Sequence, residues 1–449
     1  FATTTMAADD AQACADEKIS LTCLDQAKTL VDKLFWFRDH YFEENGLEKA
    51  ASKAEDVKKK MQETIMKLEE LQDKIENRAE YLMLKGKALN VVPNFESEAF
   101  EALSKSVKHD PKLTEAWIQL GECYWKKGDV SNAKNCFMTP LALGKNKVLL
   151  RNLSMVLRQV GSDAEERSKN IQESVAKAKE AVQMDIKDGS SWFILGNAYL
   201  SLFFSTNQSP KVLKQCLSAY QQAEKDIVAN SNPDLHFNRA TVYRYQEDYE
   251  LALIGYNRAA TLDPTWRDPQ HKEKQLLNAL AQMSDLIKQK GRLKGKKLSN
   301  MCQSIKESDL GPYGGGSYRS AKGQAVKLQP VTLTQLRSEV NQEKVVHGKV
   351  ACTWTFDEPV PFFFCLVDKD ETCMGVTVYN IAPGYGVKIG DSVAIPEPYV
   401  QPVNVEYRDK SFRFSTIRVD SPVVLIVNGR KQGADKQAPS VLAVSTVSE

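Results

Sequence analysis

Apolar residues recur every three or four positions through the N-terminal two thirds of the chain, which is the spacing of amphipathic α-helices. Within this region one pattern returns. Its clearest copies read Trp-x2-Leu-Gly-x2-Tyr and begin at Trp117 and Trp192. A third copy is centred on Ala240, and a weaker upstream copy contains Gly86. We therefore predict an internal repeat built from pairs of helices.

The residue types in each copy have a physical reason. A small residue at the centre, such as Gly121 or Ala240, lets the two helices of a pair cross closely. The aromatic residues and leucines around it fill the contact with the neighbouring helix. Pro111 and Pro264 end the second helix of two copies, because proline cannot continue a helix. This combination is typical of tetratricopeptide repeats, and we predict an α-solenoid over residues 78–290.

The predicted array is irregular. Residues 200–217 contain an insertion, and residues 148–160 and 171–186 resemble a degenerate helix pair. Amphipathic helices are expected upstream, over 17–43 and 47–77, where they would form an N-terminal extension or cap. A last helix over about 269–290 closes the other end.

After residue 290 the pattern changes. Residues 291–329 are rich in Gly, Lys and Ser, which predicts a basic Gly-rich linker. Alternating apolar and polar positions then predict short β-strands separated by turns. A small barrel or sandwich fits such strands, and we favour an oligonucleotide/oligosaccharide-binding (OB) barrel. The predicted strands are 344–356, 360–367, 374–381, 392–395, 403–407, 412–419 and 423–427.

The predicted fold class is thus multidomain α + β, a tetratricopeptide-repeat α-solenoid followed by a C-terminal OB-fold β-barrel. The predicted parts are a disordered N-terminus (1–16), a helical cap (17–77), the repeat array (78–290), a linker (291–329), the OB-fold domain (330–431) and a disordered tail (432–449).

Composition excludes several classes of function. The formal net charge of +2 gives no overall attraction to nucleic acid or membrane. The nine cysteines are scattered without a C-x-x-C motif, which predicts reduced thiols in the cytosol or nucleus. No apolar run approaches the roughly 20 residues that span a bilayer. Catalytic, nucleotide-binding and metal-binding motifs are missing, so we expect no enzyme, no catalytic residues, no metal and no cofactor.

The first helix of each repeat lines the concave face of such a solenoid, and solenoids mostly bind through that face. The positions counted from the repeat motif mix aromatic and apolar residues with single charges, which suits a short peptide. For each single charge, a solvated face remains the alternative reading. Phe193 stands where a lysine would clamp a C-terminal carboxylate, which argues against that kind of ligand. The positions are Glu115, Ile118, Glu122, Trp125, Ser190, Phe193, Asn197, Leu200, Asp234, Phe237, Thr241 and Arg244.

Two basic stretches have two readings each. Six cations crowd residues 288–297, either as a solvated helix end that complements the helix dipole or as a contact to phosphates of RNA or DNA. Basic and aromatic residues alternate over 410–418, either to bind nucleic acid or to fill a barrel interior. The residues are Lys288, Lys290, Arg292, Lys294, Lys296 and Lys297 in the first stretch, and Lys410, Phe412, Arg413, Phe414 and Arg418 in the second.

Several segments carry a family resemblance. They read LVDKLFWFRDHYFEEN, LMLKGKALNVVP, EAWIQLGECYWKKGDV, DGSSWFILGNAYLSL, SNPDLHFNRAT, YGVKIGDSVAIPEP and VLIVNGRKQ. Over about residues 30–431 the chain resembles the tetratricopeptide repeat protein 5 family, also called Strap, the stress-responsive activator of an acetyltransferase co-activator. In this family a helical repeat array precedes an OB-fold domain.

The resemblance implies two roles. The first is an adaptor that recognises the N-terminal Met-Arg-Glu motif of nascent alpha- and beta-tubulin on ribosomes and triggers tubulin mRNA decay through an mRNA-decay adaptor. The alternative is a nuclear scaffold of acetyltransferase co-activator complexes in the stress and DNA-damage response, in which the OB fold contacts DNA in chromatin. The implied locations are the cytoplasm and the nucleus, without a membrane partner.

Site residues carry over by motif. Within MVLRQ, Arg158 matches the partner of the acidic residue of the peptide. Asp234 in NPDLH and Asp268 in DPTWRDP match the partners of its arginine, although relatives carry glutamate in place of Asp268. Lys294 and Lys296 in KGRLKGKKL match the contact to ribosomal RNA. Counting repeat positions also identifies Asp234, together with Phe193, Asn197 and Phe237, but does not identify Arg158.

Overall fold

A computed structural model describes residues 22–205, 208–315, 318–319, 323, 325–356 and 361–438. The chain forms two compact units, and each is described by itself. Unit 1 comprises Phe1–Ala198 and Asp226–Ser231, and unit 2 comprises Tyr199–Lys225 and Asn232–Glu449. The N-terminus predicted to be disordered (1–16) lies outside the described residues.

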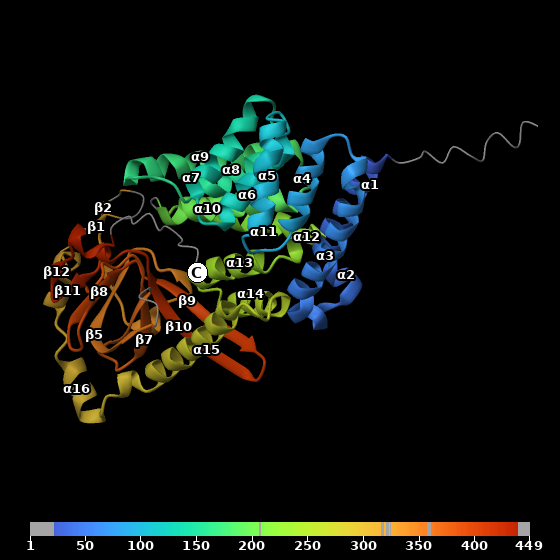
Figure 1. Cartoon of the computed structure of the whole chain (residues 1–449). Coiled ribbons are helices and arrows are strands. Elements are labelled where there is room, and N and C mark those ends of the chain that lie inside the picture. Colours follow the sequence, from blue (N-terminus) through green and yellow to red (C-terminus); the bar gives the residue numbers. More distant parts are fainter. Residues whose placement is uncertain are drawn as a thin grey trace, which may run out of the picture. The chain divides into compact units, whose positions relative to one another are not determined.

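The described part of unit 1 is helical (Figure 1). Thr22 begins the first helix with a reciprocal capping box, in which its hydroxyl accepts from the Asp25 backbone N–H. The elements are α1 (Cys23–Asp39), α2 (Tyr41–Asn45), η1 (Leu47–Ser52), α3 (Lys53–Leu71), η2 (Gln72–Lys74), α4 (Arg78–Leu89), α5 (Ser97–His109), α6 (Thr114–Lys126), α7 (Val130–Met138), η3 (Thr139–Ala142), α8 (Lys147–Leu157), α9 (Ala164–Met184), α10 (Gly189–Ser205, which continues into unit 2) and α12 (Ile227–Asn230).

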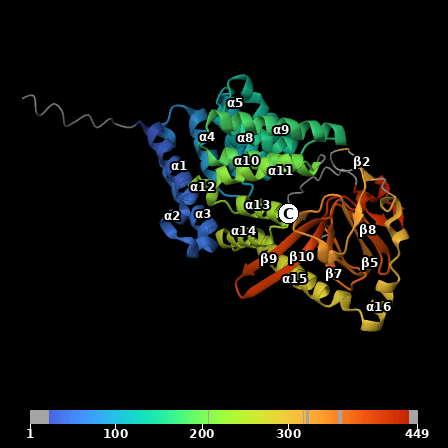
Figure 2. The same ribbon diagram turned by 180° about the vertical axis from the view of Figure 1, so that it is seen from behind.

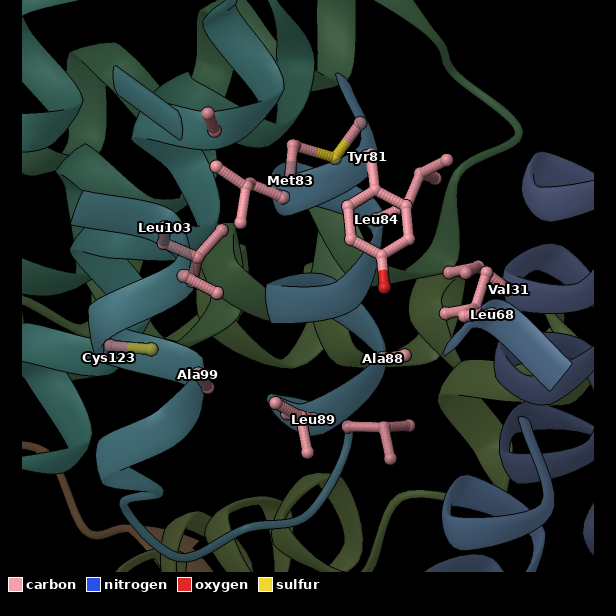
Figure 3. Packing of buried hydrophobic residues seen from close by; sticks show 14 of the residues in the cluster. Val31, Leu68, Tyr81, Met83, Leu84, Ala88, Leu89, Ala99, Leu103 and Cys123 are labelled. Atoms are coloured by element: carbon pink, nitrogen blue, oxygen red, sulfur yellow. The ribbon is translucent and has the colours of Figure 1, made fainter. Parts of the chain in front are cut away.

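The helices α1 and α3 occupy the two upstream ranges in which amphipathic helices were predicted, and both pack on α4. Val31 of α1 and Leu68 of α3 are fully buried, and they join Tyr81 and Leu84 of α4 in one cluster (Figure 3). The cluster continues through Leu103 to α6. The upstream helices therefore share one apolar core with the first repeats.

Small residues set the closeness of the repeat pairs. A Cβ atom on Gly86 of α4 would lie 2.5 Å from Leu103 Cγ of α5, and one on Gly121 of α6 would lie 2.4 Å from Phe137 Cε1 of α7. Real Cβ atoms do not approach so closely, so only glycine allows these crossings. The small residue at the centre of each repeat motif thus has the packing role that the motif predicts.

The irregular repeats keep their helices. The helices α8 and α9 form the degenerate pair, and α9 begins earlier than predicted because Asp163 caps its first turn. The predicted insertion at 200–217 is largely helical. The helix α10 extends to Ser205, and α11 begins at Pro210, which is well suited to a first helical turn.

Unit 2 combines the remaining helices with the strands. Its helices are α11 (Pro210–Ala223), α13 (Pro233–Gln246), α14 (Tyr249–Leu262), α15 (Arg267–Lys288), η4 (Lys290–Arg292), α16 (Gly295–Gln303), η5 (Glu307–Tyr313), η6 (Leu333–Gln335), η7 (Pro422–Val424) and η8 (Ala434–Lys436). Its strands are β1 (Tyr318–Arg319), β2 (Ala325–Val326), β3 (Gln329–Pro330), β4 (Glu339–Val340), β5 (Lys344–Thr355), β6 (Phe362–Val367), β7 (Cys373–Val378), β8 (Ser392–Pro396), β9 (Tyr399–Tyr407), β10 (Lys410–Val419), β11 (Ile426–Val427) and β12 (Arg430–Lys431).

Ten of the strands form one sheet with the order β12-β11-β8-β5-β6-β7-β10-β9-β4, and β3 pairs with β5. Neighbours are antiparallel except for β10 with β7 and β3 with β5. Apolar side chains of one face form the core of this β-domain, including Val346, Phe364 and Ile417. Within unit 2, α15 runs along β7 and β10 (Figure 2). The α + β fold class predicted from the sequence is confirmed.

The linker predicted over 291–329 is wrong for its first half. Residues 290–313 form η4, α16 and η5, and bury Leu298, Cys302 and Tyr313. Two glycines of this segment allow close packing against backbone atoms. Gly291 (φ +70°) lies against the Ala351 backbone, and Gly311 (φ +51°) lies against the Gly429 carbonyl. A glycine-rich composition marks positive φ and close approach as well as flexibility.

The disordered tail predicted over 432–449 is wrong for its first residues. Residues 434–436 form η8, and Gln437 pairs with Ile381 in an isolated β-bridge. The rest of the predicted tail, 439–449, lies outside the described residues.

A buried carboxylate fastens the β-domain to the repeats of unit 2. Glu247, in the left-handed conformation at the end of α13, is 3% exposed. The Tyr379 hydroxyl donates to its Oε1 at 2.9 Å, and Arg418 Nη1 of β10 lies 3.8 Å from the same atom. Arg418 also donates to the Tyr245 carbonyl at 2.7 Å and stacks over the Tyr379 ring at 4.0 Å. Burial raises the pKa of Glu247, so these partners are needed to keep its charge there.

A second polar contact repeats this arrangement at the β9–β10 turn. The Tyr407 hydroxyl donates to Glu273 Oε1 of α15 at 2.9 Å, and Arg408 Nη2 lies 3.0 Å from that oxygen. Glu273 is 7% exposed. The hairpin of β9 and β10 thus contacts a buried glutamate at each of its ends. In both contacts a tyrosine and an arginine approach the same carboxylate oxygen.

We predict that Tyr379→Phe lowers the free energy of unfolding by about 1.5–3 kcal/mol, the usual net worth of a hydrogen bond to a charged group. Urea unfolding followed by circular dichroism measures the loss. Tyr399→Phe is the matched control, because that side chain on β9 is 37% exposed. Equal stability of the two variants would contradict the role assigned to Glu247.

Candidate peptide-binding and basic surfaces

The residues predicted to contact a peptide fall in both units. Arg158, Phe193 and Asn197 belong to unit 1, whereas Asp234, Phe237 and Asp268 belong to unit 2. The two groups are therefore built separately.

In unit 1, Arg158 ends α8 as its C-cap residue. Its side chain is half-buried, and Nε donates to the Ser154 carbonyl at 3.3 Å. A guanidinium at a helix C-terminus is favourably placed, because the helix dipole is negative there. The planar fork of a guanidinium matches the geometry of a carboxylate.

Phe193 and Asn197 lie one turn apart on α10, so their side chains share a face. Both are half-buried. The first turn of α10 is fixed to α8, because Arg151 Nη1 donates to both oxygens of Asp188 at 3.2 and 2.9 Å. This ion pair sets the position of α10 relative to α8, the helix that carries Arg158.

The predicted groove positions of α6 are largely used within the protein. Ile118 is buried in a core cluster, and Glu115 pairs with Lys87 of α4 at 3.0 Å. Glu122 accepts from Asn152 of α8 at 3.1 Å, and burial raises its pKa. The charged side chains of α6 thus bind residues of neighbouring repeats. They are neither a solvated face nor open to a peptide.

In unit 2, Asp234 and Phe237 lie three residues apart near the start of α13. Phe237 packs against the Trp266 ring, with 4.7 Å between ring centroids, and against Tyr256 of α14, with 5.5 Å. The Asp234 side chain is exposed at the helix start, yet the surrounding protein and the nearby Asp263 carboxylate raise its pKa. A cation bound beside Asp234 would relieve this unfavourable charge.

Asp268 lies in the first turn of α15 and is exposed. Trp266 is the N-cap residue of the same helix, so the Phe237–Trp266 contact links the starts of α13 and α15. Asp263 shapes the intervening turn by accepting from the Thr265 and Trp266 backbone N–H groups at 3.0 and 3.3 Å. The helix starts that carry Asp234 and Asp268 are thus linked by this aromatic contact, and with Asp263 they form the acidic and aromatic end of unit 2.

Sequence reasoning missed two members of this end, Asp263 and Trp266. The available signal was the turn after α14, because Asp-Pro-Thr-Trp carries an Asp whose side chain can bond the backbone two residues later. Together, these carboxylates and aromatic rings can bind a cationic side chain.

The basic stretch forms the tip where α15 turns into α16. Lys288 ends α15, and Lys290, Gly291 and Arg292 form a left-handed turn. Arg292 returns to α15 and donates to Asp285 Oδ2 at 2.7 Å. Lys294 is the N-cap residue of α16, and Lys296 and Lys297 follow in its first turn. The last three are exposed.

The helix dipole distinguishes the two interpretations of this stretch, a helix end that complements the dipole and a contact to phosphates. Lys288 lies at a helix C-terminus, where a cation is favourable. Lys294, Lys296 and Lys297 instead lie at a helix N-terminus, where cations oppose the dipole. Complementing a dipole therefore cannot explain them, and a polyanion bound here would offset their repulsion.

The second basic and aromatic stretch, on β10, is mostly covered within unit 2. Arg418 is the buried partner of Glu247, and Phe412 packs in a cluster that includes Leu276 and Leu280 of α15. Only Lys410 and Arg413 of its three cations stay exposed. Of the two readings of this strand, nucleic-acid binding does not fit Arg418 and Phe412, which are covered within unit 2. The barrel-interior reading does not fit Phe412 either, because it packs against a helix.

In the described parts of the chain, no His, Cys, Asp and Glu side chains gather in a group that could hold a metal ion. Their helices also include none with the length and apolar character needed to cross a membrane.

Comparison with known proteins finds relatives of both the repeat region and the β-domain. The model of the tetratricopeptide repeat protein 5 OB fold domain matches residues 327–441, which confirms the predicted OB fold, and the tetratricopeptide repeat model matches 114–139. Tetratricopeptide repeat protein 5 of Homo sapiens is 50% identical over 422 residues, covering 94% of this chain and 96% of its own length. The Mus musculus protein is 50% identical over 430 residues, covering 95% and 98%. Among solved structures, a thermophilic tetratricopeptide-repeat protein of Thermus thermophilus is 17% identical, with a TM-score of 0.38, covering 44% of this chain and 98% of its own.

We predict that Asp234→Asn raises the melting temperature at neutral pH. The raised pKa of Asp234 means that its charged form is disfavoured in the folded state, so removing the charge stabilises the fold. The gain should shrink as the pH falls through this raised pKa, because wild-type Asp234 then takes up its proton. Thermal melts across a pH series measure the effect. Asp409→Asn, at the exposed β9–β10 turn, is the control, and a loss of stability in Asp234→Asn would contradict the prediction.

Proposed function

Because the chain belongs to the tetratricopeptide repeat protein 5 family, we propose that it is a peptide-binding adaptor for the N-terminal Met-Arg-Glu motif of nascent tubulin. It acts in the cytoplasm on translating ribosomes and directs tubulin mRNA to decay through an mRNA-decay adaptor. The observation that carries the proposal is the acidic and aromatic end of unit 2, where Asp234 and Asp268 begin two helices that the Phe237–Trp266 contact links.

The arginine of the motif suits this end of unit 2. Asp234 and Asp268 begin two helices that the Phe237–Trp266 contact holds together. A guanidinium can pair with carboxylates while its flat face stacks on an aromatic ring. A bound arginine would also lower the pKa of Asp234 towards its ordinary value, which adds to the affinity.

The glutamate of the motif suits unit 1. Arg158 carries its guanidinium at the end of α8, and α10 carries Phe193 and Asn197 one turn apart. Asn197 can bond the peptide backbone, and Phe193 can contact the apolar methionine.

Ribosome contact suits the basic tip. Lys294 and Lys296 are exposed at the start of α16, where the helix dipole opposes their charge. Phosphates of ribosomal RNA would supply the missing anions. This contact uses residues distinct from those assigned to the peptide.

Double-mutant cycles test the peptide assignment. We predict that Arg158→Ala and Asp234→Asn each weaken binding of a Met-Arg-Glu-Ile peptide about tenfold, or about 1.4 kcal/mol. Arg158→Ala should be insensitive to a further Glu→Ala change in the peptide, and Asp234→Asn to an Arg→Ala change, because each pair is then already broken. Fluorescence anisotropy with a C-terminally labelled peptide measures the affinities.

Arg413→Ala is the control for these cycles, because that side chain of β10 is 75% exposed and pairs with Glu406. Fully additive effects of protein and peptide changes would overturn the assignment of the two charge pairs. Wild-type affinity of Arg158→Ala would remove this residue from the site.

A charge reversal tests the ribosome contact. We predict that Lys294→Glu with Lys296→Glu abolishes co-sedimentation with ribosomes at physiological salt and leaves the affinity for the free peptide unchanged. Lys105→Glu with Lys108→Glu on α5 changes the net charge equally and should retain co-sedimentation. Equal losses in the two double variants would show that only net charge matters.

A further inference from the structure

Three cysteines meet on neighbouring strands of the β-domain. Cys352 of β5 and Cys365 of β6 lie directly opposite each other in the antiparallel register. Cys365 also lies opposite Gly375 of β7, so Cys373, the first residue of β7 and two residues before Gly375, faces the same side of the sheet. All three sulfurs therefore lie on one face of the sheet. None of them belongs to the surfaces assigned to the peptide or to ribosomal RNA.

This thiol cluster, defined as Cys352, Cys365 and Cys373, lies beneath α15 and α16. Cys352 and Cys365 are buried in a cluster with Leu298 and Cys302 of α16. The left-handed turn before α16 sits on β5, because a Cβ atom on Gly291 would lie 3.0 Å from Ala351. All of these residues belong to unit 2.

The register selects one pair within the cluster. Directly opposite residues of antiparallel strands have Cα atoms about 4.5–5.5 Å apart, within the range that a disulfide spans. Cys365 and Cys373 are instead diagonal neighbours, because Cys365 lies opposite Gly375. Diagonal neighbours are about 7–8 Å apart, beyond the usual disulfide range. A shift in register places Cys352 opposite Cys365, since the pairing slips by one residue at Ala351.

The two thiols of the pair differ in their electrostatic surroundings and in their exposure. The hydrogen bond with Cys365 and the nearby Arg292 guanidinium lower the pKa of Cys352, whereas the hydrogen bonds with Cys352 and Cys373 raise the pKa of Cys365. The cation of Arg292 beside Cys352 favours a thiolate at this position. Cys352 is 7% exposed, while Cys365 is fully buried. Cys352 is thus the sulfur of this pair that a small oxidant reaches first.

We propose that Cys352 and Cys365 are a modification site at which hydrogen peroxide forms a reversible cross-strand disulfide. The Cys352 thiolate attacks one peroxide oxygen, and the O–O bond breaks to give a sulfenic acid and hydroxide, which takes up a proton to form water. Cys365 then loses its proton and attacks the Cys352 sulfur, and the S–O bond breaks to release a second water. In total, two thiols lose two electrons and two protons, and one peroxide becomes two waters.

The experiment that tests this proposal looks for the disulfide directly in the full-length chain. After graded peroxide and alkylation of the remaining thiols, non-reducing peptide mass spectrometry should show a Cys352–Cys365 cross-link that dithiothreitol removes. Cys373→Ser should retain it. Cys365→Ser should abolish it and leave Cys352 as sulfenic acid, which dimedone traps. The buried Cys123 and Cys216 of the helices are internal controls and should stay reduced.

Two results would overturn the proposal. One is a cross-link that joins Cys365 mainly to Cys373 in the wild-type chain. The other is the absence of any Cys352 cross-link at peroxide doses that already oxidise the half-buried Cys373. Both are read in the wild-type protein, so they do not depend on the folding of the serine variants. Neither depends on peptide or ribosome binding.

Discussion

The burial of Glu247 is the constraint on which the organisation of unit 2 depends. A carboxylate that has left water is stable as an ion only when hydrogen bonds and an opposite charge replace its hydration. Those replacements come from Tyr379 and Arg418 of the β-domain, so the last repeats and the sheet satisfy each other's polar groups. Removing either partner leaves a buried charge uncompensated, which is far more costly than losing a surface ion pair.

Both candidate surfaces carry their charged residues at the N-termini of helices. Asp234 and Asp268 begin helices, where the dipole favours anions, yet the surrounding protein and Asp263 still raise the pKa of Asp234. Lys294 and Lys296 begin a helix whose dipole disfavours them. In each case the free protein holds charge that a ligand of opposite sign would relieve. The same logic that makes these positions unfavourable in isolation makes them suited to binding.

The sequence was sufficient for features that rest on local pattern. Gly121 and Ala240 mark helix crossings because only a small residue fits there, and alternating residues mark the strands that pair in the sheet. It was insufficient where tertiary contacts decide. A glutamate at a helix end looks like a surface residue, so Glu247 was not identified. An arginine beside phenylalanines left nucleic-acid binding open, although the Arg418 side chain is only 12% exposed.

Among the candidate site residues too, local pattern identifies some, and tertiary contacts determine the others. Motif position made Asp234 and Phe237 candidates, because the repeat fixes which side of a helix they occupy. Trp266 was missed because its contact with Phe237 joins helices from different parts of the chain. Gly291 was read as part of a flexible linker, since composition alone does not distinguish a mobile glycine from one held at positive φ against a strand.

The way Glu247 and Arg418 share one buried site also bears on how the protein can be dissected. A fragment cut at the predicted OB-fold boundaries, 330–431, would retain Arg418, Tyr379 and Phe412 but lose the helices that cover them. Cutting there would create a basic and aromatic surface that the intact chain does not present. Nucleic acids adhere to such surfaces through phosphate attraction and base stacking. A fragment that begins before α13 would keep that surface covered, and its binding properties would be those of the protein.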